Sequence, residues 1–229
     1  MQRVKPRVED LPKNFDCHDY FKIKVGEDVT YREAHRATAA YYGMIEWTDM
    51  QFGRVISKLE ALNVLDDFVV VFLSDHGEML GEKGLWEKQQ YFDASVRVPF
   101  FISRPQKFNQ GSAIIQENVS LVDLFPTLCE LAQVPIPNGL DGRSLVPLME
   151  GRADDWPNEV YSELYHPFNG PSVMVKQDHL KYFRFEGKEW PEQLFDLDAD
   201  PGENQNLIND AAHADDLRRL RAKANDFLS

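Results

Sequence analysis

The residues most capable of chemistry are consecutive: Ser74-Asp75-His76-Gly77-Glu78 come directly after an apolar run. A carboxylate beside an imidazole, followed by a glycine that admits a close backbone approach, suits a divalent cation. The same residues also fit a plain turn, in which Asp75 caps the next segment and His76 lies on the surface. The short motif by itself does not separate a metal site from a turn.

A glycine-punctuated loop follows and ends at a lysine, because residues 81–88 read Gly-Glu-Lys-Gly-Leu-Trp-Glu-Lys. Glycines allow such a loop to fold back over the edge of a sheet, where the Lys88 ammonium could meet an anionic group. Lys88 can equally be a solvated charge paired with a glutamate. Trp86 is expected to anchor the loop against the core.

The elements that must position these residues form an α/β pattern. Thr30 and Glu33 have the spacing of a capping box, which predicts that a helix starts there. Apolar side chains then recur every three or four residues as far as Leu59, the pattern of a long amphipathic helix over 31–62. The run 68–73 is β-branched and aromatic without alternation, which indicates a strand buried on both faces, as in a parallel sheet covered by helices.

Further elements complete a first domain over residues 1–134. A second apolar strand is expected over 98–103, and a short strand near 119–121. Asp123 has the position of an N-cap for a helix that carries Leu124, Leu128 and Leu131. Prolines and glycines crowd residues 135–157, which indicates a connector with turns.

The pattern changes in the remaining residues, which we expect to form a second domain over 135–229. Short strand-like pieces over 160–164, 172–176, 180–185 and 193–197 are separated by turn residues. This pattern favours a small antiparallel sheet. A terminal helix is expected over 211–228, with acidic residues early and arginines late, the order that the helix dipole favours.

Composition excludes several classes of protein. The 229 residues carry a net charge of −13, so the chain is not expected to bind the phosphate backbone of a nucleic acid, and no nucleic-acid partner is predicted. Cys17 and Cys129 are too few and too far apart for a disulfide framework or a thiolate metal cluster. No apolar run has the length of a membrane span or of a signal peptide core, so the sequence as it stands predicts a cytoplasmic chain without a membrane partner. A longer parent protein would allow a periplasmic or secreted location.

Several stretches resemble the C-terminal portion of the sulfatase family, within the alkaline-phosphatase superfamily. The stretches that carry the resemblance are 74–88, Arg97-Val-Pro99, 122–127, 141–147 and 193–203, in that order along the chain. Choline sulfatases and iduronate-type sulfatases are the most similar in character. The resemblance implies an α/β/α sheet domain, of which this chain carries the C-terminal part, followed by a subdomain with a small antiparallel sheet and a helix.

The same resemblance implies roles for the residues singled out above. Asp75 and His76 match metal ligands, and Lys88 matches the lysine that contacts the sulfate group. The implied activity is sulfuric ester hydrolysis on a sulfate ester substrate. The implied cofactor is a divalent metal, with Ca²⁺ first and Mn²⁺ or Mg²⁺ as alternatives. The Phe195-Asp196 segment is expected to be a structural turn in the C-terminal subdomain.

Several parts of the family pattern are missing, among them the N-terminal Asp-Asp metal pair, the Pro-His-x-Pro histidine and the nucleophile motif. Sulfatases use a formylglycine made from the first residue of Cys-x-Pro-x-Arg or Ser-x-Pro-x-Arg, and these 229 residues contain neither motif. The isolated chain is therefore predicted to be inactive. A phosphate or phosphonate ester hydrolase of the same superfamily and a non-catalytic binding or scaffold protein are the alternatives. Uncovered sheet and helix surfaces would favour a homo-oligomer.

Overall fold

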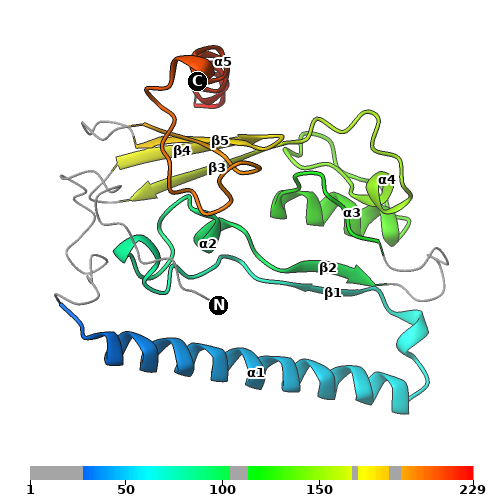
Figure 1. The fold of residues 1–229 in the computed structure, drawn as a ribbon. Helices are drawn as coiled ribbons and strands as arrows, with labels where there is room; N and C mark the ends of the chain where they lie inside the picture. The colour runs from blue at the N-terminus through cyan, green and yellow to red at the C-terminus, as the bar shows by residue number, and fades with distance from the viewer. Residues whose placement is uncertain (1–27, 104–112, 167–169, 186–191, 229) are drawn as a thin grey trace. The chain divides into compact units, whose positions relative to one another are not determined.

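The computed structural model describes residues 28–103, 113–166, 170–185 and 192–228 (Figure 1). These residues fall into two compact units, with the described residues up to 103 in the first and those from 113 onward in the second. The domain boundary predicted between residues 134 and 135 stays a prediction. None of the helices in the described ranges has the length and hydropathy of a membrane span.

The first unit contains a long helix and a two-stranded sheet. Helix α1 spans Tyr31–Ala61, strand β1 spans Val70–Leu73, the short helix α2 spans Asp93–Val96 and strand β2 spans Phe100–Ser103. The predicted capping box at the start of α1 is confirmed, because the Thr30 hydroxyl accepts from the Glu33 N–H and the Glu33 carboxylate accepts from the Thr30 N–H. These bonds satisfy N–H groups that have no partner inside the helix.

The prediction of a parallel sheet for the run 68–73 is wrong for the described residues. Strand β1 pairs with β2 in antiparallel register, with Val70 opposite Ser103 and Leu73 opposite Phe100. The strand is half-buried, and Phe68 lies outside it and is 46% exposed. An unbroken apolar run fits a pleated surface of either kind, so it does not determine the direction of pairing.

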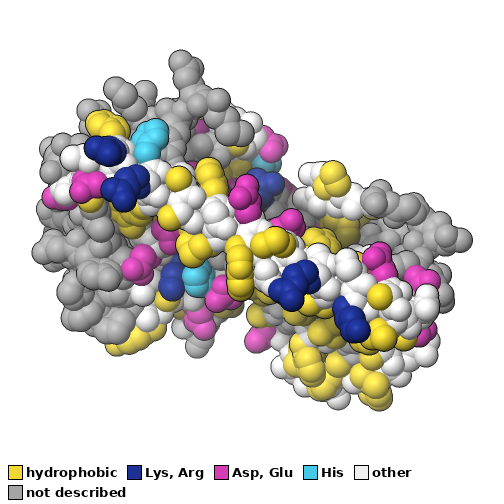
Figure 2. Space-filling view, turned by 90° about the horizontal axis from the view of Figure 1, so that it is seen from below, with side chains coloured by type: hydrophobic (Ala, Val, Ile, Leu, Met, Phe, Trp, Pro, Cys, Tyr) yellow, Lys and Arg dark blue, Asp and Glu magenta, His cyan; other side chains and the backbone are white. Residues whose placement is uncertain are grey.

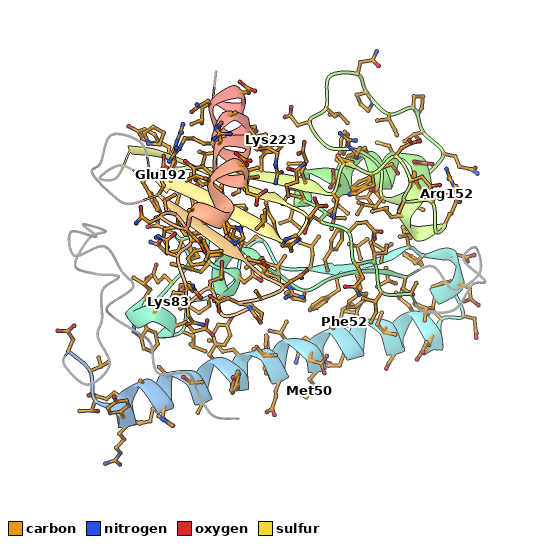
Figure 3. The ribbon with its side chains drawn as sticks, turned by 45° about the horizontal axis from the view of Figure 1, so that its top comes forward. Met50, Phe52, Lys83, Arg152, Glu192 and Lys223 are labelled. Carbon is orange, nitrogen blue, oxygen red and sulfur yellow. The ribbon has the colours of Figure 1, made fainter. Side chains whose placement is uncertain are left out.

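Strand β2 begins at Phe100 and not at Val98, because Pro99 has no N–H to donate to a partner strand. Helix α1 packs on this small sheet through Phe52. The Phe52 ring centroid lies 5.1 Å from that of Phe72 and 6.0 Å from that of Phe101, and the two strand rings stack at 5.2 Å. Figure 3 shows Phe52 and Met50 on opposite sides of α1. Much of the predicted apolar pattern of α1 therefore stays uncovered.

The second unit contains the predicted antiparallel sheet, which is confirmed. Its order is β3-β4-β5-β6, with β3 at Glu159–His166, β4 at Gly170–Gln177, β5 at Leu180–Phe185 and β6 at Gln193–Asp196. The predicted terminal helix is also confirmed as α5, Ala214–Phe227. The core between this sheet and α5 is made of Val173, Val175, Leu180, Tyr182, Leu194, Leu220 and Ala224.

Of the two expectations for residues 119–131, the strand is wrong and the helix is confirmed. Residues 121–123 form a 3₁₀ turn and not a strand. The predicted helix is confirmed as α3, Leu124–Leu131, and Asp123 has the predicted N-cap position, but its side chain makes no capping hydrogen bond to α3. Instead the Asp123 carboxylate accepts from the Ser120 N–H at 2.8 Å and from the Arg143 N–H at 2.9 Å. The connector after α3 contains one short helix, α4, at Val146–Met149.

Candidate active-site turn and loop

Asp75 and His76 lie in the turn directly after β1 and are solvent accessible. Their side chains are 84% and 42% exposed, and the Asp75 Oδ2 lies 3.5 Å from the His76 Nε2. The His76 Nδ1 lies 2.9 Å from the Gly77 carbonyl oxygen. Because a carbonyl oxygen only accepts, this bond places the proton on Nδ1 and leaves Nε2 as the ring's electron-pair donor. A carboxylate oxygen and an imidazole nitrogen thus face each other.

Backbone hydrogen bonds hold this turn against α2. The Gly77 N–H donates to the Ser95 carbonyl at 2.7 Å, and the Glu78 N–H donates to the Ala94 carbonyl at 2.9 Å. A Cβ atom on Gly77 would lie 2.1 Å from the Ala94 oxygen. The glycine in this turn is therefore required by a close approach of two backbone segments.

The loop from residue 79 to residue 88 folds over its own small core. Met79 and Leu85 are fully buried, and the Gly81 N–H donates to the Leu85 carbonyl at 2.8 Å. Trp86, the anchor expected from the sequence, is half-buried. Sequence reasoning missed Lys83, which is only 8% exposed and has its ammonium 4.9 Å from the centre of the Phe92 ring (Figure 3). A cation over an aromatic face is a stabilising contact, but nothing in its sequence position indicated burial.

Lys88 ends this loop with an exposed side chain. The Ser95 hydroxyl donates to the Lys88 carbonyl at 2.7 Å, so the lysine backbone is tied to α2, as is the turn that carries Asp75. Hydrogen bonds to α2 thus hold both the turn with Asp75 and His76 and the backbone of Lys88. Their roles toward a metal and a sulfate group stay predictions.

The other residues considered from the sequence have ordinary places. His35 is exposed on α1, whereas Cys17, His18 and the side chain of His166 lie outside what the structure describes. Cys129 is a buried free thiol.

The expectation of a turn at Phe195-Asp196 is wrong for these two residues, because they form the end of strand β6, and the turn follows directly at residues 197–199. The Asp196 Oδ1 accepts from the N–H groups of Asp198 and Ala199 at 3.0 and 3.1 Å. Its carboxylate therefore stabilises the chain reversal after β6.

The residues present fit a divalent metal as part of a ligand set. Asp75 and His76 offer one oxygen and one nitrogen donor, whereas calcium takes about 6–8 oxygen ligands. Within the described ranges, no group of three or more His, Cys, Asp or Glu side chains could hold a metal ion. The remaining ligands of such a site would come from elsewhere.

Comparison with known proteins then decides the family. Residues 10–134 match the family model described as Sulfatase, and residues 81–228 match the model described as N-sulphoglucosamine sulphohydrolase, C-terminal. The chain belongs to the sulfatase family. This membership confirms the resemblance read from the motifs, and it implies a divalent metal in general.

Sulfatases and a related hydrolase are among the similar proteins. An arylsulfatase of Clostridium perfringens is 36% identical over 81% of this chain and 39% of its own length. A choline-sulfatase of Rhizobium meliloti is 36% identical over 85% of this chain and 38% of its own length. The solved phosphonate monoester hydrolase from Silicibacter pomeroyi has a TM-score of 0.67 and 32% identity over 76% of this chain and 37% of that chain. This sulfatase-family chain thus spans about two fifths of the length of the proteins it matches.

Proposed function

We propose that this chain is the C-terminal portion of a sulfuric ester hydrolase and carries part of its metal and sulfate site. The observation that carries the proposal is the pairing of the Asp75 carboxylate with the His76 imidazole at 3.5 Å, in the turn to which the Lys88 loop is tied. Membership in the sulfatase family supports the reaction class. The substrate class is a sulfate ester.

Each of the three residues has a distinct part in this proposal. Asp75 and His76 would hold a divalent metal, Ca²⁺ in the first instance, which when bound polarises the sulfate oxygens as a Lewis acid. The Lys88 ammonium would bind a non-bridging sulfate oxygen and stabilise the negative charge that grows there in the transition state. His76 keeps its Nε2 available because its Nδ1 proton is held by the Gly77 carbonyl.

The nucleophile would come from sequence outside these 229 residues, since neither formylglycine motif occurs in them. We therefore expect the isolated chain to show no turnover of an aryl sulfate above background. With two protein ligands for the metal, we also expect weak or no divalent binding. Stoichiometric, sub-micromolar Ca²⁺ or Mn²⁺ binding in a calorimeter would contradict the second expectation.

A second candidate is a phosphonate or phosphate ester hydrolase of the same superfamily. The likeness to the phosphonate monoester hydrolase, at 32% identity, favours it among the alternatives. A non-catalytic protein that keeps the fold is a third candidate. The three differ in whether a nucleophile is supplied and in which ester is hydrolysed.

The decisive experiment begins with the DNA immediately upstream of Met1. An in-frame sequence that encodes Cys-x-Pro-x-Arg or Ser-x-Pro-x-Arg would support the assignment as a sulfatase. The protein encoded by the longest reading frame is then assayed with matched aryl sulfate and aryl phosphonate esters. In that enzyme Lys88→Ala should lower kcat/KM for the sulfate by on the order of 10²-fold or more, because it removes a charge aimed at the developing oxyanion. Lys58→Ala, an exposed lysine on α1, is the control.

Three outcomes would overturn the proposal. These are an unchanged kcat/KM in Lys88→Ala, a preference for the phosphonate, and strong metal-dependent turnover by the 229-residue chain alone.

A further inference from the structure

The carboxylate of Glu78 joins the two ends of the loop that leads to Lys88. One oxygen, Oε1, accepts from the Leu80 N–H at 3.0 Å and from the Glu87 N–H at 2.7 Å. The side chain is half-buried, and the two donors stand seven residues apart in the sequence. Hydrogen bonds to an ionised acceptor are about twice as strong as neutral ones, so this is a firm closure of the loop.

The backbone at both donors needs such a closure. Leu80 and Glu87 have φ values of 50° and 65°, in the left-handed region that side-chain-bearing residues rarely adopt. Beside the carboxylate, the Met79 N–H donates to the Glu87 carbonyl at 2.7 Å. Hydrogen bonds thus hold a strained residue at each end of the loop.

Lys88 directly follows Glu87, the second of the two residues that donate to Glu78. Its carbonyl accepts from the Ser95 hydroxyl at 2.7 Å, and Ser95 is only 3% exposed. The Ser95 carbonyl in turn accepts from the Gly77 N–H in the turn that carries Asp75 and His76. The lysine is therefore connected to the proposed ligands from two sides, through Glu78 and through Ser95.

We infer that Glu78 is a positioning residue, which together with Ser95 fixes Lys88 relative to Asp75 and His76. The inference rests on the proposed function for the role of Lys88, but not for the loop closure itself. It also explains how an acidic residue stands close to a site for an anionic ester. The Glu78 Oε1 accepts from two N–H groups, and their dipoles offset its charge.

The closure is tested on the 229-residue chain with two spin labels in the first unit, one at Lys88→Cys and one at Arg54→Cys on α1, after Cys17 and Cys129 are replaced by serine. Glu78→Ala should broaden the distance distribution between the labels. Glu78→Gln should keep it narrow, because the amide oxygen accepts the same two bonds. Glu82→Ala, an exposed acid in the same loop, is the matched control. An unchanged distribution in Glu78→Ala, or a distribution equally broad in Glu82→Ala, would overturn the inference.

The consequence for catalysis is tested in the longest reading frame with an aryl sulfate. Glu78→Ala should lower kcat per folded molecule by about tenfold to 10²-fold with a smaller change in KM, because the charged group is misplaced and not removed. Glu78→Gln should recover most of this loss, and Ser95→Ala should reproduce part of it if Glu78→Ala does not fold. A purely structural role would lower the melting temperature and leave kcat per folded molecule unchanged, which would contradict the inference. An inactive wild-type enzyme would overturn the proposed function instead, and the spin-label experiment would still decide the loop closure.

Discussion

Tyr182 shows how burial changes the acid–base behaviour of a single side chain. It lies on β5 in the core of the second unit and is fully buried. Burial, and after it the nearby Glu192 carboxylate, raise the pKa of Tyr182 from 10.0 to about 12. Both causes act in the same direction, because each disfavours the phenolate.

This shift predicts a loss of stability in alkali. The folded pKa exceeds the unfolded one, so the contribution is fully present below about pH 10 and is lost as the pH rises toward 12. Two pKa units correspond to about 2–3 kcal/mol. Urea unfolding at pH 8 and pH 11 should show a steeper loss for the wild type than for Tyr182→Phe, which has no proton to release. Equal losses in the two proteins would show that Tyr182 is not the group responsible.

A buried ion pair links β5 to the turn after β6. The Lys181 Nζ lies 2.8 Å from the Glu203 Oε1, with the lysine fully buried and the glutamate 4% exposed. Removing one partner of a buried pair leaves an uncompensated charge, which typically costs about 3–5 kcal/mol. Glu203→Leu should therefore lower the free energy of unfolding by about that amount.

The matched control replaces both partners. Lys181→Met with Glu203→Leu should recover most of the loss, because no buried charge remains. The pair is not expected to affect function, since neither residue belongs to the proposed site. A double variant as unstable as the single one would show that other contacts of these residues dominate.

At the scale of secondary structure, the C-terminal end of α3 carries a conformational strain that can be relieved. Gln133 has a φ of 59° and is exposed, and its N–H donates to the Glu130 carbonyl. The next N–H, on Val134, donates to the Cys129 carbonyl at 3.0 Å. Gln133 follows the C-cap residue Ala132, at the position of a helix end where glycine is favoured because the backbone is left-handed.

Gln133→Gly should raise the free energy of unfolding by about 0.5–1 kcal/mol, because glycine adopts the left-handed conformation without steric cost. Gln133→Ala is the control and should give no gain, since alanine keeps the Cβ. Thermal or urea unfolding measures both. A gain of the same size in the alanine variant would assign the effect to the lost glutamine side chain.

At the scale of the whole molecule, the surface of α1 is unusually apolar for a solvent-facing helix. Tyr42, Met44, Trp47, Met50 and Val55 are each 57–62% exposed. Figure 2, seen from the side of α1, shows hydrophobic side chains among charged ones on this surface. Several large apolar side chains exposed on one helix favour association.

We therefore expect the 229-residue chain to self-associate or to bind a hydrophobic dye, despite its net charge of −13. Trp47→Lys with Met50→Lys should shift sedimentation toward the monomer and reduce dye binding. Asp49→Asn, an exposed change on the same helix, should not shift either measurement. A clean wild-type monomer with no dye binding would contradict the prediction.

The sequence by itself determined the elements whose signals are local. The capping box at Thr30, the four short strands of the second sheet and the terminal helix were all predicted, because each depends on residues a few positions apart. The pairing of Asp75 with His76 is local in the same sense, since neighbours in a turn stay close in space. The family followed from motifs that are themselves short.

Only the tertiary structure decided what depends on partners far apart in the chain. The antiparallel pairing of β1 with β2, the bond from the Asp123 carboxylate to the Arg143 N–H and the burial of Lys181 against Glu203 all join segments about 20 residues apart or more. Such contacts form only once the chain has folded back on itself, and no spacing of residue types fixes which distant groups then meet.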